Sequence, residues 1–308
     1  MREVPLPPPS PLHEREGLAA PADLAARRSA ARAALPACPD NECRLGDAAI
    51  RALRFNPQGA SRATVLHWHG GGFRLGSPEY AAPFAAALAQ ACNVEVICPE
   101  YRLAPEHPFP AGLIDGLAAI EGALALGVGR LILSGDSAGG GLAASLAALC
   151  AQRGITLAGL VLISPWLDLT VSAPSFQECG ATDPLFSQAA ASEAAEQYLQ
   201  GHPASDPLAS PLFFGPTRFP PACISAGSGE VLRDDAERLH EKLLAARRTS
   251  RLLVVPGMEH VAALRGQDLT GSAEVFRQVS EFVSGLVRPG NAAQSRRASP
   301  RQAESHQA

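Results

Sequence analysis

The sequence contains no apolar run that approaches the ~20 residues of a transmembrane helix. Its first residues, MREVPLPPPSPLHEREG, place prolines and charges where a signal peptide needs a continuous apolar stretch. The formal net charge of -4 gives no reason to expect a nucleic acid or an acidic membrane as a partner. We therefore expect a cytoplasmic protein with no nucleic-acid partner and no stable membrane insertion.

Metal and disulfide signals are also lacking. The seven cysteines are odd in number and include no C-x-x-C pair, and the eight histidines do not show metal-ligand spacing. Reduced, mostly buried thiols fit this pattern best. We expect no metal site and no cofactor.

What is present is an alternation of apolar strands and helices. With 308 residues, of which 46% are hydrophobic and 18% charged, one large globular domain is the simplest expectation. The pattern predicts strands at 64–68, 94–98, 130–134, 157–163, 221–226 and 251–255, and two short ones within 43–55. It predicts helices at 78–92, 114–126, 138–150, 234–246 and 270–287. This order is typical of an α/β fold with a mostly parallel, eight-stranded sheet and helices on both faces.

Three segments depart from that alternation. Residues 1–40 contain a Pro-rich start and an Ala/Arg-rich helical stretch, and we expect them to be disordered or to pack over the main domain, 41–288, as part of a cap. Residues 169–205, with one helical piece at 187–199, predict the rest of a helical cap. The polar residues 289–308 predict a disordered tail.

A G-x-S-x-G sequence, Gly135-Asp136-Ser137-Ala138-Gly139, lies where a predicted strand runs into a predicted helix. Such a turn presents the serine hydroxyl to a ligand, and the glycines let neighbouring backbone pass closely. The amide of Ala138, at the start of the helix, is placed to stabilise an oxyanion. A surface turn rich in small residues is the alternative, and the strand-to-helix setting favours the nucleophile.

Three successive glycines follow the strand 64–68, in the sequence His69-Gly70-Gly71-Gly72-Phe73. They permit a backbone path on which amides face inward together, which favours anion stabilisation over a flexible loop. A proline-rich loop follows at 101–110, where Arg102 and Glu106 could brace the glycines by a partly buried ion pair. His107 in the same loop is expected to be a packed histidine rather than a base.

A serine nucleophile needs a base and an orienting acid. His260 follows the last predicted strand, whereas the other histidines lie in tails, in the cap, on a helix, inside a strand or, for His69 and His107, in the glycine loop and the proline-rich loop. Glu230 lies in the loop after the preceding strand and is the favoured acid. Asp234 and Asp235 are rivals, although acidic residues are also common in the first turn of a helix.

Five motifs, in this order, resemble the hormone-sensitive-lipase-like esterases, the group with the GDSAG nucleophile turn. They are HGGGF, YRLAPEHPFPA, GDSAGG, ASPL and PGMEH, and the similarity covers about residues 40–287. The resemblance implies the α/β-hydrolase fold, Ser137 as nucleophile, His260 as base and the amides of Gly71, Gly72 and Ala138 as the oxyanion hole. In the family the acid is usually an aspartate thirty residues before the histidine, and here Glu230 occupies that place. We take His69, Asp136, Arg102 and Glu106 as supporting residues.

The resemblance implies a serine carboxylesterase that acts on short-chain acyl esters through an acyl-enzyme. A lactone hydrolase of the monoterpene lactone type, using the same triad, is one alternative, because the triad does not separate these substrates. A ligand-binding receptor on this fold is another, although such a protein should have lost the base or the triple glycine. The expected partner is a small-molecule ester or lactone, and a homodimer through the last strand and helix is compatible with the sequence.

Overall fold

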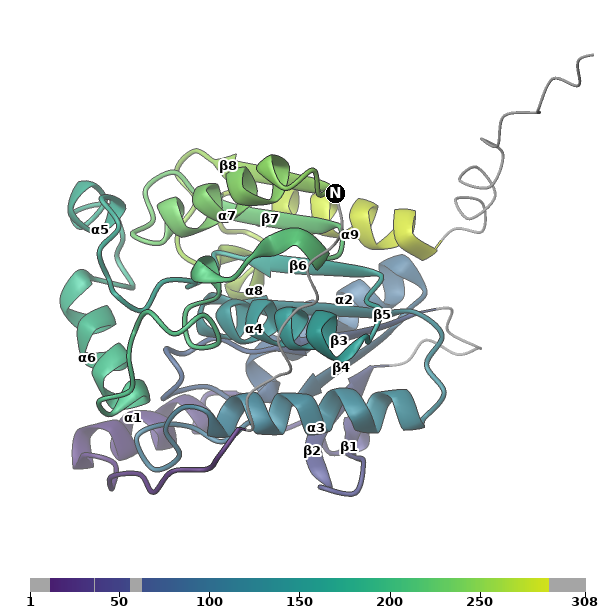
Figure 1. Ribbon diagram of the computed structural model, residues 1–308, viewed down its shortest axis with the longest axis horizontal. Coiled ribbons are helices and arrows are strands. Elements are labelled where there is room, and N and C mark those ends of the chain that lie inside the picture. The colour runs from purple at the N-terminus through teal and green to yellow at the C-terminus, as the bar shows by residue number, and fades with distance from the viewer. Residues whose placement is uncertain (1–11, 36, 56–62, 288–308) are drawn as a thin grey trace, which may run out of the picture.

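A single eight-stranded sheet organises the chain in the computed structural model, which describes residues 12–35, 37–55 and 63–287. The strand order is β1-β2-β4-β3-β5-β6-β7-β8 (Figure 1). The first three strands of that order pair in antiparallel fashion, and all later pairs are parallel. The strands are β1 (Glu42–Leu45), β2 (Ile50–Phe55), β3 (Thr64–Trp68), β4 (Glu95–Pro99), β5 (Leu131–Asp136), β6 (Gly159–Ile163), β7 (Ala222–Gly227) and β8 (Ser250–Val255).

Helices cover both faces of the sheet (Figure 1). One hydrophobic core joins the sheet to α3 (Ala111–Ala125), α4 (Ser137–Arg153) and α7 (Arg233–Ala245). The other lies between the opposite face and α2 (Ala82–Cys92), α8 (Ala262–Arg265) and α9 (Ser272–Val287). The predicted mostly parallel, eight-stranded α/β sheet with helices on both faces is confirmed.

The register of the parallel strands brings the predicted motifs together. Trp68 at the end of β3 pairs with Gly135 in β5, so the glycine loop that follows β3 lies beside the turn that carries Ser137. Gly227 at the end of β7 pairs with Val255 at the end of β8, so the loops that carry Glu230 and His260 are also neighbours. Functional residues gather at this carboxyl edge, as in other parallel sheets.

The segment that we call the cap segment, residues 169–205, holds α5 (Ser175–Glu178) and α6 (Gln188–Leu199). The N-terminal helix α1 (Ala22–Ala33) lies near α6 at the same side of the molecule (Figure 1). Arg15, just before α1, donates hydrogen bonds to the carbonyls of Leu199 and Gln200 at the end of α6. The described part of the N-terminal region thus packs on the cap segment, while residues 1–11 and the predicted tail 289–308 lie outside the described residues.

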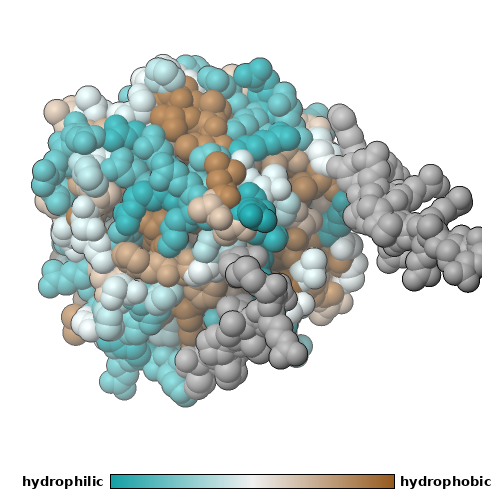
Figure 2. Space-filling model, turned by 45° about the horizontal axis from the view of Figure 1, so that its top comes forward, coloured by the Kyte–Doolittle hydropathy of each residue, from teal (hydrophilic) through white to brown (hydrophobic). Residues whose placement is uncertain are grey.

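The surface carries few large hydrophobic side chains. Figure 2 shows hydrophobic residues in separate patches among hydrophilic ones. Leu185 in the cap segment, Phe213 and Leu244 are among those exposed. Within the described residues, no helix combines the length and the apolar character needed to cross a bilayer. Strand β8 forms one edge of the sheet, and a dimer through it stays a prediction.

Candidate active site

Ser137 lies at the sharp junction between β5 and α4. Its φ of 50° is in the left-handed region, where a non-glycine residue costs about 1–3 kcal/mol and persists only because its surroundings hold it. A Cβ atom at Gly135 would collide with the backbone of Gly139, and one at Gly139 would collide with the carbonyl of Trp68. The two glycines of the motif therefore permit the tight turn that holds Ser137 in this conformation.

A continuous chain of hydrogen bonds joins the three predicted side chains. Ser137 Oγ is 3.0 Å from His260 Nε2, and His260 Nδ1 is 3.0 Å from Glu230 Oε2. A carboxylate only accepts hydrogen bonds, so Nδ1 carries the proton of the neutral ring and Nε2 is free to accept from the Ser137 hydroxyl. This tautomer lets His260 withdraw a proton from Ser137.

The carboxylate of Glu230 is held on its other oxygen. Glu230 is fully buried, and its Oε1 accepts hydrogen bonds from the amide of Gly227 at 2.6 Å and from Ser164 Oγ at 2.9 Å. Ser164 also accepts a hydrogen bond from the amide of Val261, next to the histidine. Sequence reasoning missed Ser164, although its place directly after β6, between the strands of Ser137 and Glu230, was a usable signal.

The electrostatics favour protonation of His260. Burial lowers the pKa of the imidazole, but the hydrogen bond and charge of Glu230 outweigh that effect, with smaller contributions from the carboxylates of Asp183 and Asp136. The net result raises the pKa of His260 above its ordinary value of 6.5. A raised basicity suits a group that must take a proton from a hydroxyl.

The rival carboxylates have other partners. Asp234, at the start of α7, accepts a hydrogen bond from the amide of Ser175 and pairs with Arg233. Asp235 is fully buried and accepts from the amides of Leu167 and Asp168. Burial raises the pKa of Asp235 to about 7. Of these three acids, only Glu230 is within hydrogen-bond distance of His260.

The glycine loop has a conformation that exposes backbone amides. Gly71, Gly72 and Phe73 all have positive φ, at 113°, 61° and 61°. Within the described part of the chain, the amides of Gly71 and Gly72 have no hydrogen-bond acceptor. The amide of Ala138 lies in the first turn of α4, where no acceptor is available within the helix. These are the donors that an oxyanion requires.

Two supporting residues hold the start of the loop. Asp136 Oδ1 accepts hydrogen bonds from the amide of Gly70 at 3.1 Å and from His67 Nε2 at 3.3 Å. His69 donates from Nδ1 to the carbonyl of Gly70 at 2.7 Å and stacks on Tyr101. Burial lowers the pKa of His69, which keeps this ring neutral. Asp136 and His69 thus fix the glycine loop against β5.

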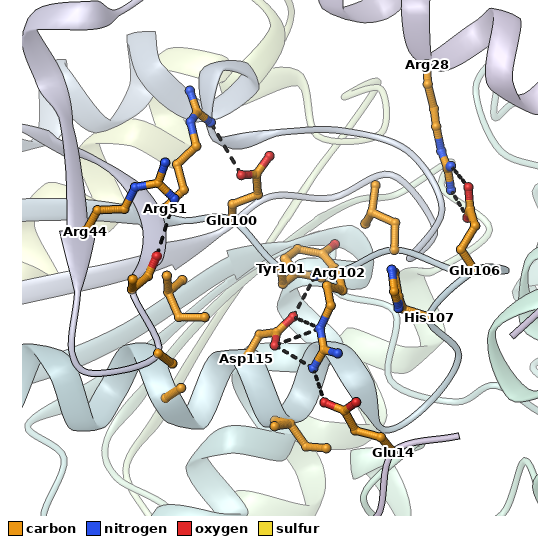
Figure 3. A pocket seen from close by; sticks show the side chains of 16 residues that line it. Glu14, Arg28, Arg44, Arg51, Glu100, Tyr101, Arg102, Glu106, His107 and Asp115 are labelled. Carbon is orange, nitrogen blue, oxygen red and sulfur yellow. Dashed lines mark hydrogen bonds and ion pairs between the residues drawn. The ribbon is translucent and has the colours of Figure 1, made fainter. Parts of the chain in front are cut away.

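The expected ion pair between Arg102 and Glu106 is wrong. Arg102 pairs with Asp115 of α3 at 2.9 Å and with Glu14 at 2.8 Å, whereas Glu106 pairs with Arg28 of α1 at 2.5 Å (Figure 3). The two side chains point in different directions because α1 and α3, which are distant in sequence, offer nearer partners (Figure 3). The packing expected for His107 is also wrong, because this side chain is exposed.

These residues line a surface cavity of about 720 Å³, between the β1–β2 hairpin, α3 and the loop 100–107 (Figure 3). Its acidic and basic side chains largely neutralise one another through the ion pairs described above. None of Ser137, Glu230 and His260 lines this cavity. The cavity is therefore separate from the hydrogen-bonded chain of the candidate site.

The cap segment contributes an aromatic side chain, Phe186, next to His260. Phe186 stacks on the imidazole with ring centroids 5.9 Å apart, and Trp166 meets Phe186 edge-on at 5.4 Å. Asp183 positions Phe186, because its carboxylate accepts from the amides of Phe186 and, in the loop of Glu230, Val231. Sequence reasoning missed Asp183 and Phe186, since the cap segment shows no periodic pattern that would fix its path.

No three side chains among His, Cys, Asp and Glu gather closely enough in the described ranges to hold a metal ion. The groups that converge at the carboxyl edge of the sheet are a hydroxyl, an imidazole, a carboxylate and backbone amides. This set can perform nucleophilic substitution at a carbonyl carbon.

Comparison with known proteins gives consistent matches. A family model described as alpha/beta hydrolase fold matches residues 65–264. The chain is 40% identical over 201 residues to an acetyl-hydrolase of Streptomyces hygroscopicus, covering 64% of this chain and 67% of that protein. It is 31% identical over 243 residues to an esterase of Acinetobacter venetianus, covering 78% of this chain and 80% of that protein.

Solved structures match over most of their length. The crystal structure of EstE5 soaked with p-nitrophenyl butyrate superimposes with a TM-score of 0.80 and 31% identity, covering 88% of this chain and 93% of that chain. A hormone-sensitive lipase from a metagenome library superimposes with a TM-score of 0.79 and 32% identity, covering 86% of this chain and 93% of that chain.

Proposed function

Because the chain belongs to the hormone-sensitive-lipase-like esterases of the α/β-hydrolase family and is a carboxylesterase, we propose that it hydrolyses short-chain acyl esters through a Ser137-His260-Glu230 triad and an acyl-enzyme. One observation carries this proposal. The hydroxyl, imidazole and carboxylate form an unbroken chain with two links of 3.0 Å each.

In the first half of the proposed reaction, Ser137 Oγ attacks the ester carbonyl while its proton passes to His260 Nε2. The imidazolium that forms is stabilised by Glu230 through Nδ1–H. When the tetrahedral intermediate collapses, His260 returns the proton to the departing alcohol, and the acyl group stays on Ser137 as an ester. The charge on Glu230 does not change, because this carboxylate only orients and stabilises the ring.

The negative charge on the former carbonyl oxygen needs donors that are in place before the reaction. We assign this role to the amides of Gly71, Gly72 and Ala138. Backbone amides cost little reorganisation when charge develops, and removal of one oxyanion-hole donor, a side-chain amide, lowers kcat about 10²- to 10³-fold in a serine protease. The hydrogen bond that the Gly70 amide donates to Asp136 supports this assignment, because it ties the glycine loop to the end of β5, directly before Ser137.

In the second half, water takes the place of the alcohol. His260 removes a proton from water, the hydroxide attacks the acyl carbonyl, and the same amides stabilise the second oxyanion. His260 then returns the proton to Ser137 Oγ, which leaves as the free hydroxyl with release of the carboxylic acid. The base must be neutral at the start of each half, so activity depends on deprotonated His260.

The aromatic side chains around the triad support a preference for short acyl groups. Phe186 stacks on His260, and Trp166 contacts Phe186. The backbone amide of Trp166 donates a hydrogen bond of 2.9 Å to the carbonyl of Ser137. Bulky rings this close to the nucleophile reduce the space for a long acyl chain. The related EstE5 was soaked with p-nitrophenyl butyrate, a short-chain ester.

The test compares the wild type with Ser137→Ala on p-nitrophenyl esters of increasing acyl length, together with a set of lactones. We expect the highest kcat/KM for acetate to butyrate and loss of turnover in the variant, with an unchanged thermal unfolding curve. Hydrolysis by Ser137→Ala at the wild-type rate would refute the assignment of Ser137 as the nucleophile. A higher kcat/KM for lactones than for every ester would replace the proposed substrate class.

A further inference from the structure

Arg74 is a buried arginine that directly follows the glycine loop. It is 4% exposed, and its guanidinium contacts one face of α6 in the cap segment. Nη1 lies 2.7 Å from Glu193 Oε1 and 3.3 Å from Gln197 Oε1, and Nη2 lies 3.4 Å from the carbonyl of Ala190. Gln197 also donates to Glu193 at 3.0 Å, which holds the carboxylate in place for Arg74.

The backbone of Arg74 is tied to the glycine loop and to α1. Its amide donates to the carbonyl of Gly71 at 3.2 Å, and its carbonyl accepts from Arg28 Nε at 2.8 Å. Arg28 in turn pairs with Glu106 and donates to the carbonyl of Ala104. The residue therefore connects the loop, the N-terminal helix and the cap segment through separate groups.

The loop itself needs such support. Gly71, Gly72 and Phe73 are consecutive residues with positive φ, and Phe73 is not a glycine. Phe73 stacks on Tyr198 of α6 with ring centroids 4.0 Å apart, and a Cβ atom at Gly72 would lie 3.4 Å from the methyl group of Ala194. The conformation that turns the Gly71 and Gly72 amides away from other acceptors is thus held by α6.

We propose that Arg74 is a positioning residue for the oxyanion hole. Its side chain holds the glycine loop against helix α6 of the cap segment, so the Gly71 and Gly72 amides take their catalytic orientation only when α6 is docked. The inference rests on the proposed function, since it assigns Arg74 a part in the same reaction. Arg74 touches no reacting atom and acts through the backbone of Gly71.

The expected kinetic effect is specific. Misplaced oxyanion donors weaken binding of the transition state more than binding of the neutral ester, so kcat falls while KM changes little. A displacement on the order of 1 Å costs about 10²-fold. We expect Arg74→Met to lower kcat about 10- to 100-fold, with KM within about threefold of the wild type.

Arg74→Met keeps an unbranched side chain, and Glu193, which is 55% exposed, keeps its access to water when the partner is lost. Glu193→Gln breaks the Arg74–Glu193 ion pair at its exposed partner. It therefore tests the same contact if Arg74→Met fails to fold. Arg74→Lys can restore the charge contact with Glu193 but not the contacts with Gln197 and Ala190, so it should recover part of kcat. Arg153→Met is the matched control, because it breaks an exposed Arg–Glu pair of 3.0 Å with Glu121.

The experiment measures kcat and KM for p-nitrophenyl butyrate and the Ki of an alkyl trifluoromethyl ketone. Ser137 Oγ adds reversibly to the ketone carbonyl while its proton passes to His260, and the oxyanion that forms occupies the hole. The prediction is that Ki rises by the same factor by which kcat/KM falls in Arg74→Met, with a smaller change in Glu193→Gln and none in Arg153→Met.

An unchanged Ki in both Arg74→Met and Glu193→Gln would overturn the inference. So would a decrease in kcat/KM that comes entirely from a higher KM, with kcat unchanged. The outcome for the proposed function is separate. If Ser137→Ala keeps wild-type activity, the proposed function fails whatever Arg74 does. If Ser137→Ala is inactive and Arg74→Met behaves like Arg153→Met, only the role of Arg74 fails.

Discussion

Replacing Glu230 by glutamine should reverse the tautomer of His260. Glu230 Oε1 accepts from the Gly227 amide at 2.6 Å and from Ser164 at 2.9 Å, so the oxygen of the new amide is retained at this position. The NH₂ group then replaces Oε2 and faces His260 Nδ1. This NH₂ group and a protonated Nδ1 are both hydrogen-bond donors, so they cannot bond to each other. Nδ1 must therefore lose its proton to become an acceptor, and Nε2, now protonated, cannot take the proton of Ser137.

The size of the effect follows from the same geometry. An acid-to-amide change of this kind in a serine protease triad lowers kcat about 10⁴-fold by fixing the wrong tautomer. That factor corresponds to about 5.4 kcal/mol of activation free energy. We expect a loss of this order for Glu230→Gln, with little change in KM, because the fold and the amides of the glycine loop are not altered.

The pH profile supplies a second readout. In the wild type, kcat/KM should fall as the pH decreases through the raised pKa of His260, which lies above 6.5. Glu230 is the main cause of that increase, whereas burial acts in the opposite direction. The residual activity of Glu230→Gln should therefore persist to lower pH than that of the wild type.

Two controls make the measurement decisive. Glu259→Gln removes a carboxylate next to His260 in sequence, but one that is 44% exposed and paired with Arg265 at 2.7 Å, and it should keep wild-type kcat. Asp234→Asn tests the rival acid. A Glu230→Gln variant within about tenfold of the wild type, or a larger loss in Asp234→Asn, contradicts the assignment of Glu230.

Two further predictions concern buried polar groups around the sheet edge. Ser164→Ala removes one of the two donors to Glu230 Oε1, and a hydrogen bond to a charged group contributes about 1.5–3 kcal/mol to stability. The free energy of unfolding in urea should therefore decrease by about this amount, and an unchanged value would show that the Gly227 amide alone suffices. Asp235 has a pKa of about 7 in the fold against an ordinary value of 3.8, so the folded state binds more protons between these values and the free energy of unfolding should decrease as the pH rises from about 4 to about 7. The free energy of unfolding of Asp235→Asn, measured in urea, should lack this pH-dependent decrease. Curves of unfolding free energy against pH that run parallel for the variant and the wild type would contradict the prediction.

The sequence predicted the architecture because periodic patterns determine the strands and helices. The predicted strand 130–134 extends two residues further to Asp136, and the predicted helix 187–199 begins one residue later at Gln188. Ser137, Glu230 and His260 could be singled out because each lies in the turn or loop that follows a strand, and parallel strands collect such residues at one edge. The structure brings the three together, while their catalytic roles stay predictions.

The partners of the supporting residues could not be predicted in the same way. Arg102 and Glu106 are four residues apart, yet they pair with α3 and α1, because the choice depends on which distant helix packs nearest. Arg74 belongs to none of the predicted site residues, although its guanidinium contacts α6, more than a hundred residues later in the chain. Such contacts depend on how the cap segment folds back, which local patterns do not encode.

The acyl-enzyme on Ser137 is the most direct test of the proposed reaction. Wild-type protein mixed with p-nitrophenyl butyrate should be quenched in acid within the first turnover, digested and analysed by mass spectrometry. We predict a butyryl group on the peptide that contains Ser137 in the wild type and none in Ser137→Ala. A butyryl group on another residue, or turnover with no covalent adduct at the shortest quench times, would contradict the account.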